Sequence, residues 1–372
     1  MNITCSTKDL AAALSATARI VNSHTTMSVL ANILITTNDD QVAFRATDLE
    51  TTLEVRIPGE VTEPGSALVP AKAVSSYAGN LPTGIAKVST HGMTTRIESE
   101  LSQCDFHGLN ADEFPPLPDA KTSKLLGVAT STVTTGVDAV TFCASREPSR
   151  GPVLMGTLLE IRNGKLRMVA TNGYRLALWS TPVDSGAANR SVIVPTHALT
   201  EMRRNLGVAE TIELTTLGTS DVQLRAQAGQ TVLVTRLVDG SYPNFQQVIP
   251  SAYDATVTVG TAPLVGALHR LGVVATDLAN TVRIDIQQDR LVLTASSDAV
   301  GSAREEVFCE TSGEPPKMAL NARYFAEMLS HIDSPQITIS LGSRLSPVKI
   351  VPTTPRDNEE RVYVLMPVRD HE

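Results

Sequence analysis

The sequence is poor in aromatic residues, in cysteine and in long apolar runs. Only 4% of its 372 residues are Phe, Trp or Tyr, so the core must be mainly aliphatic. No apolar run approaches the roughly 20 residues that a membrane-spanning helix needs, and the first residues lack the basic and apolar regions of a signal peptide. Val, Ile, Leu and Thr dominate, which favours β-structure. We therefore expect a soluble, cytoplasmic, β-rich protein.

The few cysteines show no metal or disulfide pattern. Cys5, Cys104, Cys143 and Cys309 form no C-x-x-C pair, and none has a histidine at metal-ligand spacing. Such isolated cysteines are typical of buried free thiols in a reducing compartment. We expect no metal and no cofactor.

Basic residues are fewer than acidic ones. The 31 Lys and Arg residues face 39 Asp and Glu residues, which gives a net charge of −8. This balance argues against broad electrostatic binding to nucleic acid, although an acidic protein can still carry a local basic surface.

Catalytic signatures are missing as well. The chain has no G-x-x-x-x-G-K-[ST] loop, no G-x-G-x-x-G, no H-E-x-x-H and no G-x-S-x-G. Ser346-Pro-Val-Lys349 matches the S-x-x-K of penicillin-binding enzymes, but its S-D-N and K-T-G companions are absent and it falls where a strand is predicted. The sequence predicts a non-catalytic binding protein, and an enzyme built from repeats is the alternative.

One unit is present three times. Three similar segments lie at residues 34–55, 158–179 and 282–303. Each has two predicted strands around a polar turn, followed by Ala-Thr or Ala-Ser and a second polar turn. Their alanines, Ala46, Ala170 and Ala295, lie 124 and 125 residues apart. A short strand running into a helix follows each segment, at 67–82, 192–207 and 318–333. An amphipathic helix with Ser or Thr at its predicted N-cap precedes each one, at 6–22, 130–144 and 260–276.

A period of this length matches a whole domain rather than a solenoid repeat or propeller blade. Chance similarity between hairpins is the alternative, but three landmarks share the period. The predicted fold class is α+β, with three tandem domains of two helices packed on antiparallel sheets. We expect the domains at residues 1–121, 122–251 and 252–372, with 112–124 and 242–254 as connecting segments.

Several stretches, in order along the chain, resemble one family. They are ATDLE (46–50), PVLMGTLLE (152–160), VATNGYRLA (169–177), SVIVP (191–195), LVDGSYPNFQQVIP (237–250) and YVLMPVR (363–369). With them, the sequence resembles the bacterial DNA polymerase III beta subunit, the sliding clamp, and the actinobacterial clamps in particular.

The resemblance implies that two chains join head to tail as a homodimer, a closed ring of six domains. Such a ring encircles duplex DNA without reading its sequence. It implies tethering of the DNA polymerase III alpha subunit, the clamp loader and other proteins that carry clamp-binding peptides, with no active site.

The resemblance also implies two surfaces on each chain. The DNA-facing residues would be His24, Lys72, Arg146, His197, Arg203 and Arg204, with Lys8, Arg19, Arg270 and Arg323 as further candidates on predicted helices. The dimer interface would bring Cys104 and Phe106, on the edge strand at 102–109, against Val273 and Val274. Alternatively, Phe106 belongs to the core of its own domain.

A peptide-binding pocket between the second and third domains is implied too. Its residues would be Leu154, Thr171, Gly173, Tyr174, Arg175, Leu176, Pro243, Gln247, Val248, Asn321, Tyr324, Leu345, Pro347, Val364, Leu365, Met366, Pro367, Val368 and Arg369. Leu, Val and Met suit an apolar peptide groove. Simple packing between domains is the alternative.

Three pocket positions depart from the family pattern. Gln247 stands where many clamps have arginine, Pro347 replaces a small polar residue, and Tyr174 stands where histidine is frequent. One hypothesis is a specialised second clamp whose altered pocket confers tolerance to a peptide-like antibiotic. Drift within the lineage is the alternative.

Overall fold

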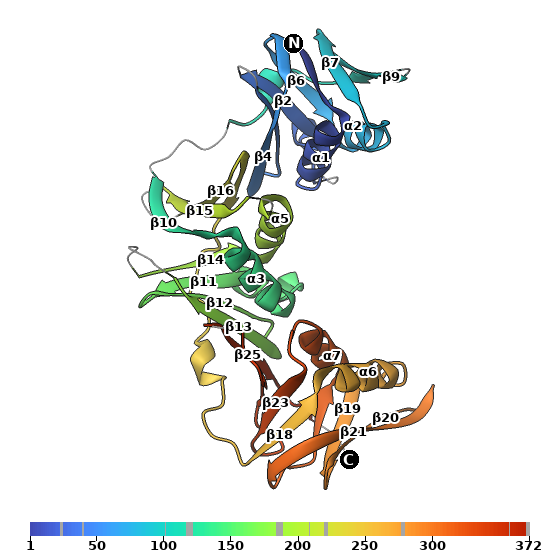
Figure 1. Cartoon of the computed structure of the whole chain (residues 1–372), viewed down its shortest axis with the longest axis vertical. Coiled ribbons are helices and arrows are strands. Elements are labelled where there is room, and N and C mark those ends of the chain that lie inside the picture. The colour runs from blue at the N-terminus through green and yellow to red at the C-terminus, as the bar shows by residue number, and fades with distance from the viewer. Residues whose placement is uncertain are drawn as a thin grey trace. The chain divides into compact units, whose positions relative to one another are not determined.

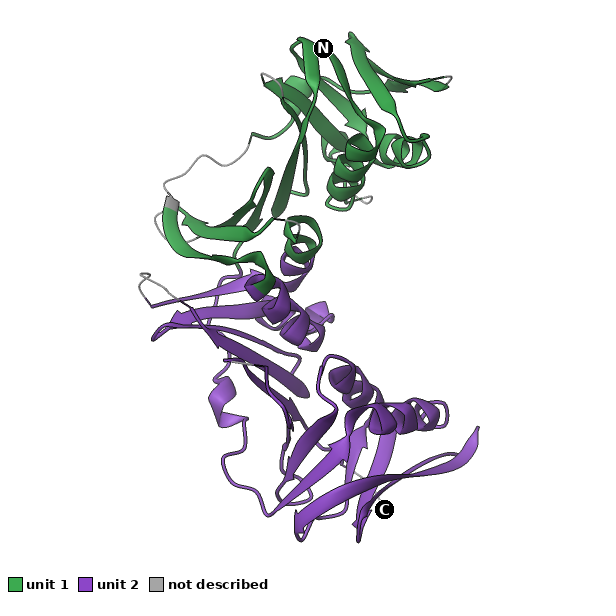
Figure 2. Cartoon of the chain, viewed as in Figure 1, with its two compact units in different colours: residues 1–131, 201–237 green, residues 132–200, 238–372 purple. Residues whose placement is uncertain are grey.

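Two compact units make up the computed structural model of the chain (Figure 1). Unit 1 comprises Met1–Ser131 and Glu201–Leu237, and unit 2 comprises Thr132–Thr200 and Val238–Glu372 (Figure 2). The structure describes residues 1–22, 25–38, 41–100, 102–116, 122–183, 189–207, 209–218, 222–276, 280–356 and 358–369. The division runs through the predicted second domain, and each sheet lies within one unit.

The first sheet of unit 1 belongs entirely to the first repeat. Its strands run in the order β5-β1-β7-β8-β9. Their bounds are β1 (Asn2–Ser6), β5 (Glu60–Glu63), β7 (Ile85–His91), β8 (Thr94–Ser99) and β9 (Ser102–His107). Strand β9 lies at the edge, as the family resemblance implied.

The second sheet of unit 1 joins two repeats, in the order β10-β15-β16-β17-β4-β3-β2-β6. From the first repeat come β2 (Asn32–Asn38), β3 (Gln41–Thr47), β4 (Thr51–Pro58) and β6 (Ser66–Pro70). From the second come β10 (Thr122–Ala129), β15 (Thr211–Leu217), β16 (Gln223–Ala228) and β17 (Thr231–Arg236). The two halves meet where β4 pairs antiparallel with β17, from Thr51↔Thr235 to Val55↔Thr231.

Unit 2 has one long sheet, in the order β14-β11-β12-β13-β25-β24-β23-β18-β21-β20-β19-β22. The second repeat supplies β11 (Gly156–Arg162), β12 (Lys165–Thr171), β13 (Arg175–Pro182) and β14 (Arg190–Pro195). The third supplies β18 (Ala255–Gly260), β19 (Thr281–Gln287), β20 (Arg290–Ser297), β21 (Gly301–Gly313), β22 (Met318–Asn321), β23 (Gln336–Leu341), β24 (Val348–Pro352) and β25 (Glu360–Leu365). Here β13 and β25 form the junction.

Each repeat carries a pair of helices. They are α1 (Thr7–Ala18) and α2 (Ala71–Gly79), α3 (Thr130–Val140) and α5 (Thr196–Leu206), and α6 (Thr261–Gly272) and α7 (Ala322–Ser330). Figure 1 shows α1 beside α2, and α6 beside α7. The short elements are α4 (Pro152–Met155), η1 (Ser28–Ala31), η2 (Ala111–Glu113), η3 (Thr141–Cys143), η4 (Pro148–Arg150) and η5 (Phe245–Gln247). No helix among the described residues is long and apolar enough to cross a membrane.

The predicted repeats are confirmed as β2–β3, β11–β12 and β19–β20, each followed by a strand that leads into a helix. The first helix of each repeat ends earlier than predicted. The predicted N-cap holds at Ser6, whose hydroxyl accepts a hydrogen bond from the Asp9 N–H at 3.4 Å. It is wrong for α6, where Gly260 is the N-cap and Thr261 donates to the Ser334 carbonyl at 2.6 Å.

The connecting segment after β17 covers one face of the unit 2 sheet. Phe245 is buried against a cluster of apolar side chains from β11–β14 and β25, and Tyr242 and Ile249 pack on the same cluster. Because both faces of β13 are then covered, its first six residues are all buried. The predicted linker at 242–254 is therefore partly a structural cover.

The cysteines are reduced, and three of them are buried. Burial raises the pKa of the Cys5 thiol to about 11, with the nearby Asp9 carboxylate adding to the effect. Cys104, on the edge strand β9, is only half-buried, so the expectation of burial is wrong for this residue.

Candidate functional site

The junction between β13 and β25 brings together segments that are far apart in the sequence. Leu176 pairs with Val364, and Arg175 pairs with Leu365. Beyond the paired strands, the Met366 N–H donates to the Tyr174 carbonyl at 2.8 Å. The turn before β13 and the chain after β25 therefore lie side by side, as the predicted pocket requires.

The turn at residues 171–175 is held by its own side chains. The Asn172 side-chain oxygen accepts hydrogen bonds from the Tyr174 and Arg175 N–H groups, both at 3.0 Å. The Thr171 hydroxyl donates to the Arg175 carbonyl at 2.7 Å and accepts from the Gly173 N–H at 3.1 Å. Gly173 has φ +87°, a conformation that glycine adopts without strain.

The first repeat contains the same turn, with the same hydrogen bonds. Asp48 accepts from the Glu50 N–H at 2.9 Å and from the Thr51 N–H at 2.6 Å. The Thr47 hydroxyl donates to the Thr51 carbonyl at 3.2 Å and accepts from the Leu49 N–H at 3.1 Å. The similarity of ATDLE and ATNGY in the sequence therefore reflects one shared local structure.

The alternation of side chains along β13 separates Arg175 and Leu176, which the family resemblance placed together in the pocket. Side chains at successive strand positions point to opposite faces. Leu176 is buried in the apolar cluster under the connecting segment. Arg175 points the other way and is only 6% exposed.

Arg175 is held by partners from two segments, α7 and η3. Its guanidinium donates to a Glu327 carboxylate oxygen at 2.7 Å and to the Phe142 carbonyl at 2.5 Å, and it lies over the Tyr324 ring, 4.4 Å from the centroid. His331 stacks on Phe142 with ring centroids 4.0 Å apart, and burial lowers the pKa of this histidine. Arg175 therefore supports the site from behind, and the geometry does not favour direct contact with a ligand.

The remaining predicted pocket residues divide into a buried base and an accessible rim. Thr171, Val364 and Leu365 are buried. Tyr174, Val248 and Leu345 expose 50%, 38% and 58% of their surface. The other accessible or half-buried members are Leu154, Gly173, Pro243, Gln247, Asn321, Tyr324, Pro347, Met366, Pro367, Val368 and Arg369.

Arg150 also belongs to this rim, although it was not among the predicted pocket residues. Its guanidinium lies over the Tyr174 ring at 4.4 Å and donates to the Asn172 carbonyl at 3.3 Å. A Cβ atom at Gly173 would lie 3.4 Å from the same guanidinium, so the absence of a side chain leaves room for it. No motif around Pro148-Ser-Arg150 signals this contact.

The predicted DNA-facing side chains are exposed wherever the structure describes them. Lys72, Arg146, His197, Arg203 and Arg204 all lie at the surface. His24 lies outside the described residues.

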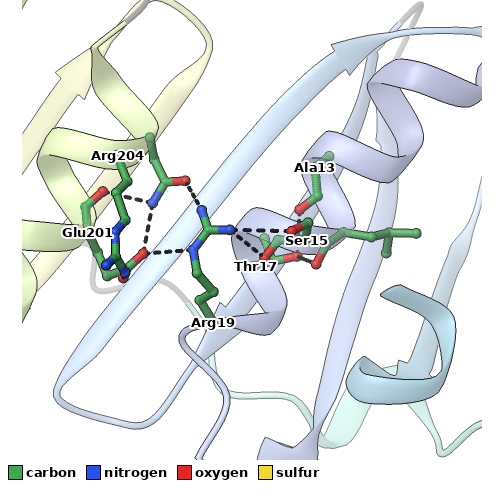
Figure 3. A network of polar contacts seen from close by, with 8 residues as sticks. Ala13, Ser15, Thr17, Arg19, Glu201 and Arg204 are labelled. Carbon is green, nitrogen blue, oxygen red and sulfur yellow. Dashed lines mark hydrogen bonds and ion pairs between the residues drawn. The ribbon is translucent and has the colours of Figure 1, made fainter. Parts of the chain in front are cut away.

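Carboxylates already pair with several cations on the helices. Glu201 accepts from Arg19 at 3.2 Å and from Arg204 at 2.7 Å, and Arg19 also donates to the Asn205 side chain at 2.7 Å (Figure 3). Arg270 pairs in the same way with Glu305, at 2.7 Å. The positive charge on these helices is therefore partly neutralised within the chain.

Comparison with known proteins decides the family. Three domains of the DNA polymerase III beta subunit match the chain in order: the N-terminal domain over residues 1–118, the central domain over 127–244 and the C-terminal domain over 246–369. The chain belongs to the DNA polymerase III beta subunit family. The predictions of this family and of three tandem domains are confirmed.

Full-length relatives agree with this assignment. The beta sliding clamp of Synechococcus elongatus is 30% identical over 376 residues, covering 99% of both chains. That of Caulobacter vibrioides is 29% identical over 377 residues, covering 99% of this chain and 100% of the relative. The Pseudomonas aeruginosa DnaN sliding clamp, solved bound to griselimycin, is 27% identical, covers 99% of both chains and superposes with a TM-score of 0.92.

Beta sliding clamps are non-catalytic subunits, and this supports the prediction that the chain is not an enzyme. Within the described ranges, no group of three or more His, Cys, Asp or Glu side chains could hold a metal ion. Lys349 of the S-x-x-K match lies in β24, where a strand was predicted. The actinobacterial likeness and the individual site residues stay predictions.

Removing the guanidinium of Arg175 tests its supporting role. We expect Arg175→Met to lower the free energy of unfolding by about 2–3 kcal/mol, because the Glu327 carboxylate and the Phe142 carbonyl lose a largely buried donor. Chemical denaturation of the full chain measures this. Arg356→Met, which breaks an exposed pair with Asp333, should change it by less than about 1 kcal/mol. Equal losses in both variants would contradict a special role for Arg175.

Proposed function

We propose that this chain works as a DNA sliding clamp, in which two copies close head to tail into a ring around duplex DNA. Family membership across nearly the whole chain and full-length similarity to beta sliding clamps support this function. The ring holds its partners on DNA by topology, so it needs no active site and no sequence recognition.

The proposal of a ring rests on one pattern of strand pairing that occurs twice inside the chain. The strand that follows the hairpin turn in one repeat pairs with the last strand of the next repeat, as β4 with β17 and β13 with β25. Two strands remain for such a junction: β9, the last strand of the first repeat, and β21, the corresponding strand of the third. Within the described part of the chain, residues 301–308 of β21 pair on one side only, with β20.

Pairing of β21 in one copy with β9 in the other would repeat the internal junction between chains. Two such head-to-tail contacts close a dimer. The outward backbone groups of β9 suit this pairing. The Gly108 N–H donates inward to Met93 at 2.8 Å, and N–H directions alternate along a strand, so those of Gln103 and Asp105 point outward.

The predicted interface side chains fit this arrangement unequally. Val273, just after α6, is 69% exposed, whereas Val274 and Cys104 are half-buried. Phe106 is only 8% exposed and packs edge-on against Tyr77, with ring centroids 5.6 Å apart. Its geometry favours the alternative, in which Phe106 belongs to the core of its own repeat, and leaves the other three side chains for the partner.

The helix surface suits loose contact with DNA. Exposed cations can attract phosphates, and a ring that slides must not hold them tightly. Pairing of Glu201 with Arg19 and Arg204, and of Glu305 with Arg270, limits the charge available to phosphates.

The rim around Tyr174, Leu345 and Met366 suits a short apolar peptide. Methionine is flexible and polarisable, so Met366 could adapt to several partners. The expected partners are the polymerase alpha subunit, the clamp loader and other proteins that carry such peptides. No observation on the described residues favours a specialised, antibiotic-tolerant second copy over an ordinary clamp.

Retention on circular DNA tests the proposed function. The purified protein is loaded onto nicked plasmid by a bacterial clamp loader and separated by gel filtration. We expect it to elute with the circular plasmid and to be lost after the plasmid is cut once. Protein that stays on the linear plasmid, or a folded dimer that never stays on the circle, would contradict encirclement.

The paired carboxylate on α5 gives a second prediction. Glu201→Gln should tighten binding to a short open-ended duplex roughly 3–10-fold in about 50 mM salt, because Arg19 and Arg204 lose their counter-charge. Fluorescence anisotropy measures the affinity. Glu213→Gln removes an equal charge from the exposed side of β15 and should have little effect. Unchanged affinity in Glu201→Gln would show that these cations do not meet DNA.

A further inference from the structure

A basic hollow of about 540 Å³ lies on the sheet of the third repeat. Its lining includes Arg283 from β19, Arg304 from β21, Lys317 just before β22 and Arg344 from the loop after β23. Arg304 lies on the exposed face of β21, whereas Val307 and Cys309 are buried on the opposite face. The hollow therefore lies on the sheet face that points away from α6.

The charge in this hollow is unbalanced. Four cationic side chains face one carboxylate in the lining, that of Asp285, in a chain whose overall charge is −8. Lys317 pairs with Asp285 at 3.0 Å, and Arg304 pairs with Glu306, just outside, at 2.7 Å. Among the described residues, no carboxylate pairs with Arg344. The guanidinium of Arg283 reaches the Ser296 hydroxyl at 3.4 Å.

Two segments of the chain connect the hollow with the candidate peptide site. Arg344 immediately precedes Leu345, the most exposed apolar residue of the rim. Met318 lines the hollow, and the next residue, Ala319, accepts a hydrogen bond at 2.8 Å from the N–H of Val368, a predicted pocket residue. A peptide that lies across the rim would therefore reach the cations within a few residues.

We propose that this basic hollow binds acidic residues that flank the apolar clamp-binding motif of a partner protein. The inference rests on the proposed peptide site and adds a second, electrostatic contact to it. Guanidinium groups bind carboxylates in a bidentate geometry. Carboxylates on a short extension of the motif match both the charge of the hollow and its position. Single-stranded nucleic acid is the competing anion, and the test below distinguishes it.

Peptides that differ only in the flanking residues test the proposal on the full-length dimer. The probe is a fluorescent polymerase-derived apolar motif, alone or extended on either side by four Asp and Glu residues or by four Asn and Gln residues. We expect one acidic extension to tighten binding about 5–10-fold over its neutral counterpart in low salt. The gain should disappear in about 0.5 M salt, where charges are screened within a few ångströms.

Two variants connect this gain to the hollow. Arg344→Gln combined with Lys317→Gln should abolish the gain and leave the affinity of the unextended motif unchanged. Arg225→Gln, on a strand of unit 1, is the matched control and should keep the gain. Met366→Asp should weaken all the peptides, because each must dock through the rim.

The outcomes separate this inference from the proposed function. If the motif binds but acidic and neutral extensions give the same affinity, the hollow does not bind acidic flanking residues. The proposed peptide site is then unaffected. If a folded dimer binds no motif at all, the proposed peptide site itself fails. If an oligothymidylate displaces the acidic extension at equal or lower concentration, the hollow is a nucleic-acid site.

Discussion

The pairing of one repeat's last strand with a strand of the repeat before it is the interaction on which the rest of the structure depends. It joins β4 to β17 and β13 to β25. Each pairing satisfies backbone groups that an open sheet edge would leave exposed. The same pattern of pairing leaves β9 and β21 without a strand from a neighbouring repeat. Two copies could therefore close into a ring through the kind of strand pairing that already joins the repeats.

The candidate peptide site is a consequence of the β13–β25 junction. The register sets the turn at Tyr174 beside the chain at Met366, and the segment around Phe245 covers the outer face of the same strands. Alternation along β13 then directs Leu176 outward to this cover and Arg175 inward to Glu327. The pairing of β13 with β25 therefore positions Tyr174 and Met366 of the rim and the supporting Arg175, and the basic hollow lies on the same sheet.

Much of this fold could be predicted from the sequence, because its signals are local. Alternating strands, the Thr-Asp and Thr-Asn turns and the helices that follow recur at one spacing, and the structure contains them. Side-chain partners could not be predicted. Arg19 meets Glu201 across 182 positions, Arg150 reaches Tyr174 through folding of a separate segment, and the burial of Arg175 depends on Glu327 from the third repeat. These side-chain contacts depend on how the strands of different repeats pair with one another, and no short sequence motif encodes that pairing.

The most direct test of this account is the mass in solution of a variant whose β9 edge cannot pair. Gln103→Pro removes an outward N–H and leaves the inward hydrogen bonds to β8 in place, at an edge position where proline is tolerated. Sedimentation should show the parent chain and a Gln103→Thr control near twice 39.6 kDa, and the proline variant, still folded, at 39.6 kDa. A proline variant that remains a full dimer would contradict closure through β9.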